Sequence, residues 1–158
     1  MIRKATIHDI SRIAEILVFS KRMTYRTIFH NDQVTFNVIT VAGVLKEYRD
    51  HPEKYRNIRI WDDGIIKGML HYEMDGTKME LVELYVDPFF TGSGIGSALL
   101  QDFLSMAKLK GIETVSLWVI KDNEAARDFY ERHGFVYVNE ERYVEDTTIR
   151  EMRYRIRL

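Results

Sequence analysis

The chain has 158 residues, of which 46% are hydrophobic, so it is long enough for one domain with a sizeable core. Its formal net charge of −1 excludes a protein whose whole surface attracts nucleic acid or another polyanion. The absence of cysteine excludes disulfides, thiolate metal sites and a cysteine nucleophile. Because no apolar run approaches the roughly 20 residues that span a bilayer, we expect a cytoplasmic protein without a membrane segment.

The first half of the chain predicts helices followed by antiparallel strands. Apolar residues recur at helical spacing over Asp9–Phe19, and a further helix is expected over Phe36–Arg49. The turn sequence Asp62-Asp63-Gly64 predicts a hairpin between two strands. The strands expected in this half are Ile2–Ile7, Asn57–Trp61, Ile65–Met74 and Lys78–Val86.

The second half alternates strands and helices. A helix over Gly94–Lys110 precedes an apolar strand over Thr114–Ile120, and a short helix runs from Asp122 or Asn123 to His133. The last strands are expected over Phe135–Asn139 and Glu151–Leu158. Since no linker, repeat or low-complexity tract is visible, the sequence predicts a single α/β domain over residues 1–158, with three layers and a mixed sheet.

A glycine-rich loop joins the strand ending at Val86 to the following helix. Its glycines, Gly92, Gly94 and Gly96, allow the backbone to approach a ligand closely. The helix behind them directs unpaired N–H groups and a positive dipole end toward the loop, an arrangement that binds phosphate. The spacing is neither that of a dinucleotide fold nor that of a P-loop, which requires a lysine after the glycines. Taken alone, the loop is equally compatible with a tight turn that binds nothing.

A second motif follows the buried strand and reads Asn123-Glu124-Ala125-Ala126-Arg127-Asp128-Phe129-Tyr130-Glu131-Arg132-His133-Gly134-Phe135. Together with Thr91-Gly92-Ser93-Gly94-Ile95-Gly96, it resembles the GCN5-related N-acetyltransferase (GNAT) family over residues 81 to 135. Thr91 departs from the family pattern, which usually has Gln or Arg at this position. The resemblance implies a three-layer α-β-α fold whose mixed, mostly antiparallel sheet splays between strands 4 and 5.

The resemblance further implies acetyl-CoA as cosubstrate, no metal, and direct attack by the primary amine of a small molecule. Backbone N–H groups from Gly92 to Ser97 are then expected to hold the pyrophosphate. The pantetheine arm would pair with Leu84–Val86, and the Val86 N–H would polarise the thioester carbonyl. The cofactor-binding residues implied are Leu84, Tyr85, Val86, Thr91, Gly92, Ser93, Gly94, Ile95, Gly96, Ser97, Asn123, Phe129 and Tyr130.

Two side chains are candidate catalytic groups. Glu83 precedes the expected splay point, where family members often carry a general base that acts through water; the alternative is a solvated strand carboxylate. Tyr130 matches the family's general acid to the CoA thiolate; the alternative is a core tyrosine with its hydroxyl at the surface. Asn123 either caps its helix, contacts pantetheine, or does both.

The acceptor is less defined by the sequence. Tyr25 and Phe29 either form an aromatic wall or pack a helix, and His71 or Tyr72 would line the acceptor cleft. A cluster of acidic residues near the catalytic strands favours a polyamine-like cation: Glu73, Asp75, Glu80, Glu83 and Asp87. Alternative functions are a protein N-terminal or lysine acetyltransferase and a CoA-binding sensor without turnover. No nucleic-acid partner is expected, and the apolar alternation over Met152–Leu158 suits either a homodimer or this chain's own core.

Overall fold

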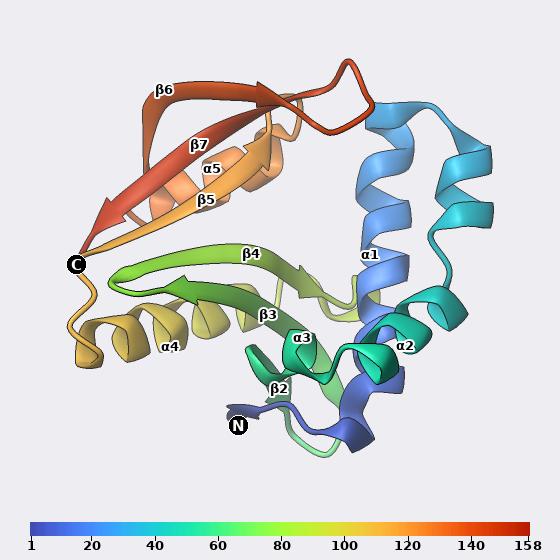
Figure 1. The fold of residues 1–158 in the computed structure, drawn as a ribbon, viewed down its shortest axis with the longest axis horizontal. Coiled ribbons are helices and arrows are strands. Elements are labelled where there is room, and N and C mark those ends of the chain that lie inside the picture. Colours follow the sequence, from blue (N-terminus) through green and yellow to red (C-terminus); the bar gives the residue numbers. More distant parts are fainter. The chain divides into compact units, whose positions relative to one another are not determined.

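The computed structural model describes residues 1–158 and places seven strands in one sheet, in the order β1-β2-β3-β4-β5-β7-β6 (Figure 1). Strands β4 and β5 are parallel, whereas β1 with β2, β2 with β3, β5 with β7 and β6 with β7 are antiparallel. This confirms the predicted mixed, mostly antiparallel sheet. The strands are β1 (Ile2–Lys4), β2 (Ile58–Asp62), β3 (Ile66–Asp75), β4 (Lys78–Val86), β5 (Thr114–Ile120), β6 (Val136–Tyr143) and β7 (Arg150–Arg157).

Five α-helices accompany the sheet, and the chain divides into two compact units. The N-terminal unit comprises Met1–Tyr72 with Glu83–Phe103, and the C-terminal unit comprises Glu73–Val82 with Leu104–Leu158. None of the helices has the length and apolar character needed to cross a membrane. The helices are α1 (Ile10–Phe29), α2 (Val41–Asp50), α3 (Pro52–Arg56), α4 (Ile95–Leu109) and α5 (Glu124–Arg132), with short 3-10 turns at Ile7–Asp9 and Pro88–Phe90 and a π turn at Val34–Val38.

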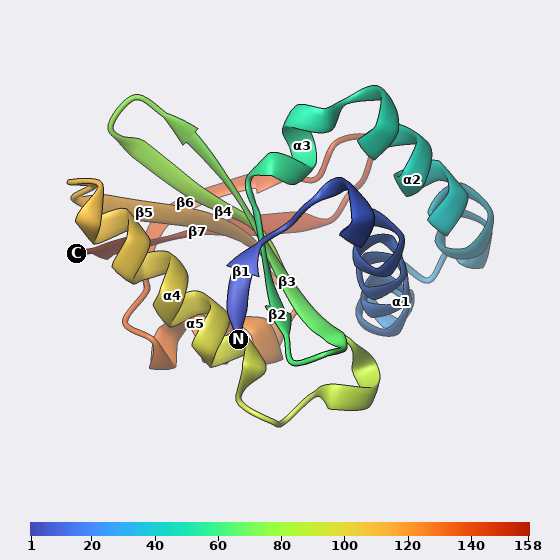
Figure 2. The same cartoon turned by 90° about the horizontal axis from the view of Figure 1, so that it is seen from below.

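The core of the N-terminal unit lies between α1 and the strands β2 and β3. Alternate residues of β2 point to opposite faces, so Ile58 and Ile60 are fully buried in the cluster that also contains the apolar side chains of α1. Arg59, between them, faces the other side and forms an ion pair with Asp102 of α4. Figure 2 shows the two helices on opposite sides of these strands. Gly68 of β3 makes room for α4, because a Cβ there would lie 2.8 Å from Ile95 Cγ2.

Helix α1 is longer than the sequence predicts. The predicted helix over Asp9–Phe19 continues to Phe29 and ends at His30, which has a left-handed backbone (φ 49°). The apolar periodicity fades after Phe19 because the second half of the helix is held by polar and aromatic contacts instead. Arg26, for example, bonds Asp32 beyond the helix end at 2.9 Å.

Other boundaries also differ from prediction; β6, for example, runs to Tyr143 rather than ending at Asn139. Two of the differences have a clear local cause. The first strand ends at Lys4 rather than Ile7, because Thr6 donates from its N–H and its hydroxyl to Asp9 Oδ2, each at 2.8 Å, and turns the chain. The helix expected over Phe36–Arg49 begins only at Val41, after Thr40, whose hydroxyl oxygen accepts the Gly43 N–H at 3.1 Å.

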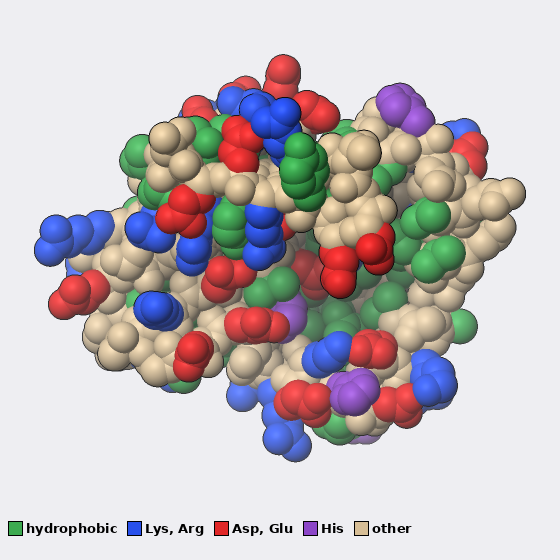
Figure 3. Space-filling model, turned by 45° about the horizontal axis from the view of Figure 1, so that its top comes forward, with side chains coloured by type: hydrophobic (Ala, Val, Ile, Leu, Met, Phe, Trp, Pro, Cys, Tyr) green, Lys and Arg blue, Asp and Glu red, His purple; other side chains and the backbone are tan.

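In the C-terminal unit, α5 covers one face of β5, β7 and β6. Tyr154 of β7 is buried and donates its hydroxyl to Glu131 of α5 at 2.7 Å. Met152 is buried as well, so the apolar alternation of β7 packs into this unit's own core. On the other face Arg153 binds Glu140 at 3.0 Å and stacks near Trp118. Figure 3 shows basic and acidic side chains interspersed over these strands, as expected of a solvated face.

Candidate active site

The end of β4 leads directly into the glycine loop. Ladder pairing joins Met79–Leu81 of β4 to Val115–Leu117 of β5, and Glu83–Val86 lie beyond that paired stretch. Asp87 then turns the chain, because its buried carboxylate accepts the Phe89 N–H at 2.9 Å. The strand that the sequence predicts to hold pantetheine therefore ends at the predicted phosphate loop.

The glycine loop has an open, left-handed backbone of the kind that can bind an anion. Gly92 and Gly94 have φ values of 77° and 82°, a left-handed conformation that side chains rarely adopt. A Cβ built on either residue would meet no atom within 4 Å, so open space lies over the backbone. The Thr91 and Ser93 hydroxyls donate to carbonyls within the loop, at 3.2 and 2.5 Å, and brace it. Helix α4 starts at Ile95, with its positive dipole end facing the loop.

Four side chains of α1 hold the end of β4. No local sequence pattern indicates these contacts, since the partners lie 60 or more residues apart in the chain. These contacts fix the position of the last residues of β4 relative to α1. Arg12 Nη2 lies 2.5 Å from Asp87 Oδ2, Ser20 Oγ donates to the Val86 carbonyl at 3.1 Å, Lys21 Nζ lies 2.8 Å from Glu83 Oε1, and Tyr25 Oη lies 2.9 Å from Tyr85 Oη.

Glu83, the predicted base, is held as an ion. Burial raises the pKa of its carboxyl, but the opposing contacts with His71 and Lys21 outweigh burial and bring the pKa to about 2. His71 Nδ1 lies 3.8 Å from Glu83 Oε2. The negative charge also acts on Tyr48 of α2, whose pKa is raised first by burial and then by Glu83. A carboxylate so strongly ionised is a weak proton acceptor while Lys21 is in place.

Of the predicted acceptor residues, His71 lies beside Glu83, Tyr25 and Phe29 lie together on α1, and Tyr72 lies elsewhere. His71 shares its face of the sheet, and Tyr25 approaches from α1 with its ring 5.7 Å from that of Phe29. Tyr72, the neighbour of His71, points to the opposite face of β3 and packs on Phe103 at 5.5 Å.

The predicted residues of the second motif lie in the C-terminal unit. Asn123 Oδ1 accepts the Ala126 N–H at 3.2 Å, which confirms that Asn123 caps α5. Tyr130 is 8% exposed and its ring packs edge-on against Phe135 at 5.7 Å. Phe129 lies beside it, with ring centroids 5.3 Å apart. The roles of all three toward CoA stay predictions.

The family model of the acetyltransferase (GNAT) family matches residues 18–135, which include the end of β4, the glycine loop and α5. The chain belongs to the GNAT family. Its helices and strands confirm the fold that the resemblance implied, from the parallel β4–β5 pair to the loop at the head of α4.

Known relatives of this GNAT protein differ in how much of their length it matches. An uncharacterized N-acetyltransferase of Methanocaldococcus jannaschii is 46% identical over 56 residues, 35% of this chain but only 25% of that protein. Spermidine N(1)-acetyltransferase of Thermoplasma acidophilum is 27% identical over 85% of this chain and 86% of its own length. The fold is similar to the crystal structure of PaiA N-acetyltransferase from Thermoplasma acidophilum in complex with coenzyme A (TM-score 0.74, 24% identity, 97% and 96% of the two chains covered).

Proposed function

We propose that this GNAT protein transfers the acetyl group of acetyl-CoA to a primary amine of a small cationic molecule. The observation that carries the proposal is the loop at the head of α4, in which Gly92 and Gly94 leave open space over a left-handed backbone. Family membership makes CoA the fitting diphosphate ligand for such a loop. The relative named for spermidine, which aligns with most of the chain, supports a cationic acceptor.

The donor would be held mainly by backbone groups. The N–H groups of Gly92, Gly94, Gly96 and Ser97 would bind the pyrophosphate, which suits a site where Thr91 replaces the longer side chain usual in the family. Pantetheine would extend along Leu84–Val86. The Val86 N–H would then stabilise the oxyanion formed at the thioester carbonyl, a contribution of about 3–4 kcal/mol for one donor.

The chemistry begins with an acceptor that is mostly protonated, since alkylammonium groups titrate near the lysine value of about 10.4. The ammonium loses a proton toward Glu83, directly or through water, and the neutral nitrogen attacks the thioester carbonyl. The C–N bond forms and the C–S bond breaks. The CoA thiolate takes a proton from Tyr130, and the attacking nitrogen gives up its second proton, which restores the Tyr130 hydroxyl. Overall, one ammonium ion and one acetyl-CoA give one amide, one CoA thiol and one released proton.

The donor site is tested by calorimetry with CoA on the wild type and on Gly94→Ala. We expect binding to weaken at least about tenfold, because the substitution strains the loop backbone and fills the space over it. Gly64→Ala is a matched control: Gly64 also has a positive φ (101°) and open surroundings, but it lies in the β2–β3 turn. No affinity of the wild type for CoA, or equal effects of the two variants, would overturn the proposal.

The acceptor is tested by release of free CoA thiol with a panel of amines. We expect turnover with spermidine and 1,4-diaminobutane. Turnover only with peptides bearing a free N-terminus or lysine would establish a protein acetyltransferase instead, and turnover only with acidic amino acids would refute a cationic acceptor. CoA binding without turnover of any amine would establish a sensor.

A further inference from the structure

A lysine of the chain itself occupies the position in which an alkylammonium would bind Glu83. Lys21 Nζ lies 2.8 Å from Glu83 Oε1 and 6.0 Å from the centroid of the Tyr85 ring. A carboxylate beside the face of an aromatic ring is a general arrangement for holding an ammonium group. Lys21 ends in the same chemical group as a primary amine substrate in its protonated form.

The surroundings make Lys21 the movable member of this cluster. The Glu83 and His71 side chains are 17% and 13% exposed and extend from neighbouring strands, whereas Lys21 is 25% exposed and has a flexible four-carbon stem. The groups facing Glu83 come from every element around it: Lys21 from α1, His71 from β3 and Tyr48 from α2. Of these, Lys21 is the one whose charged group sits on a long flexible stem that can swing toward solvent.

We propose that Lys21 is a displaceable counter-ion, which the ammonium group of the acceptor replaces on Glu83. This inference rests on the proposed function and names its substrate class as alkylammonium compounds. Lys21 competes with the acceptor and so sets the affinity for it. Displacement also brings the acceptor's N–H onto Glu83, so the group that gives up the proton takes the place of Lys21 Nζ beside the carboxylate. Lys21 therefore acts as a specificity-determining residue.

The kinetic test compares two substitutions with opposite expected effects. Lys21→Met keeps the stem but removes the charge, so the KM for 1,4-diaminobutane should fall about fivefold or more, because Glu83 no longer has a resident cation. Lys21→Arg places a guanidinium beside Glu83 that can bind the carboxylate in a bidentate manner and is harder to displace, so the KM for 1,4-diaminobutane should rise. Lys46→Met is the control, since Lys46 pairs with Asp50 on the exposed face of α2 and should leave the KM unchanged. An equal KM in all three variants and the wild type overturns the inference.

A second measurement does not depend on turnover. The carboxyl carbon of Glu83 is followed by NMR in 13C-labelled protein between about pH 4 and pH 8. In the wild type it should stay ionised throughout, and in Lys21→Met its titration should move up into this range. Saturating 1,4-diaminobutane should move it back down in Lys21→Met. A Glu83 signal that does not respond to 1,4-diaminobutane in either protein overturns the inference.

The two proposals fail in different ways. If no amine gives turnover but 1,4-diaminobutane still changes the Glu83 signal, the acetyltransferase proposal fails and the counter-ion role stands. If turnover is normal but neither the KM nor the Glu83 signal changes in the Lys21 variants, only the counter-ion role fails. Thermal unfolding of each variant verifies that it is folded, and Lys21→Arg retains the charge should Lys21→Met unfold.

Discussion

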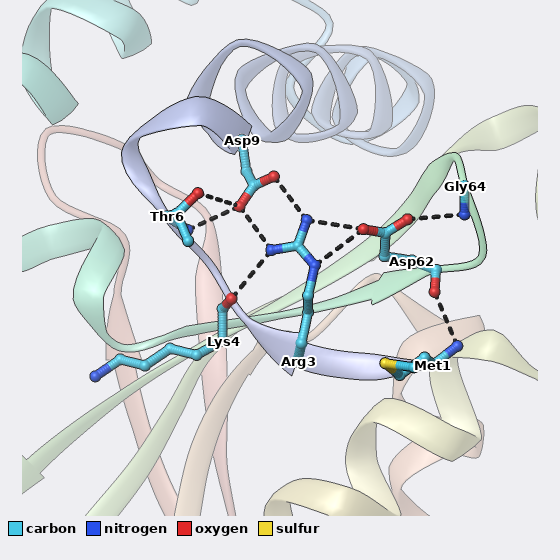
Figure 4. Close-up of polar contacts among 7 residues, drawn as sticks. All are labelled: Met1, Arg3, Lys4, Thr6, Asp9, Asp62 and Gly64. Carbon is cyan, nitrogen blue, oxygen red and sulfur yellow. Dashed lines mark hydrogen bonds and ion pairs between the residues drawn. The ribbon is translucent and has the colours of Figure 1, made fainter.

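Replacing Asp9 by Asn removes the charge at the centre of a polar network that ties the start of the chain to the β2–β3 turn (Figure 4). Arg3 donates two hydrogen bonds to Asp9, from Nη1 and Nη2, each at 2.8 Å. The same guanidinium binds Asp62 Oδ2 through Nε and Nη2, at 2.9 and 2.8 Å. Asp9 also accepts the N–H and hydroxyl of Thr6, so its carboxylate has four donors.

The size of the effect follows from the pKa of Asp9. Its bond to Arg3 lowers the pKa most, burial opposes this, and Thr6 lowers it further, so that the pKa falls from 3.8 to about 2. At about 1.4 kcal/mol per pKa unit, the ionised carboxylate stabilises the fold by ~2 kcal/mol. Because the folded-state pKa is depressed, this stabilisation is complete above the unfolded value of 3.8 and disappears as the pH falls through about 2.

We therefore expect Asp9→Asn to lower the free energy of unfolding by ~2 kcal/mol at pH 7, or the melting temperature by about 4–8 °C. Urea unfolding at a series of pH values should show the difference from wild type shrinking as the pH drops below about 4. The matched control is Asp50→Asn, which breaks an exposed pair with Lys46 and should cost less than about 1 kcal/mol. A deficit equal to that of the control, or one that persists unchanged at low pH, would refute this reasoning.

Three other substitutions test the site. Gly68→Ala places a methyl group 2.8 Å from Ile95 Cγ2, so we expect a loss of ~1–3 kcal/mol in urea unfolding and weaker CoA binding; unchanged stability would contradict this packing. Tyr130→Phe should lower kcat about 10²- to 10⁴-fold at unchanged KM for acetyl-CoA, and an unaltered kcat would leave Tyr130 a core tyrosine. Ser20→Ala removes the hydrogen bond to the Val86 carbonyl and should cost ~1 kcal/mol, which Ser20→Thr should restore; equal melting temperatures of all three proteins would argue against the tether.

Local patterns were sufficient for the elements around the glycine loop. The bounds predicted for β4 and β5 are those observed, because each is an apolar run that ends at a turn signal. Helix α4 also begins within one residue of its prediction, since glycines and a helical apolar stripe mark its start. The glycine loop itself was recognisable because a backbone with positive φ requires glycine, which can be read directly from the sequence.

Contacts between residues far apart in the chain could not be predicted from local sequence patterns. The sequence shows Glu83 and Asp87 as members of an acidic cluster and predicts a negative potential that attracts cations. In the structure Lys21 neutralises Glu83, and Arg12 neutralises Asp87. Both cations lie on α1, more than 60 residues away, and no local pattern relates a helix residue to its partner on a distant strand. For the same reason, the sequence pattern indicates Glu83 as a candidate base but not Lys21 as its ion-pair partner.

The four side-chain contacts that join α1 to the end of β4 and to Asp87 also couple the movements of the helix and the strand. Helix and strand are fastened at successive points, so thermal displacement of one carries the other. If the Val86 N–H polarises the thioester carbonyl as proposed, an amine bulky enough to push α1 outward would shift the Val86 peptide with it and weaken that contact. Under that proposal, a substitution on this helix that admits a larger amine would change the rate together with the selectivity.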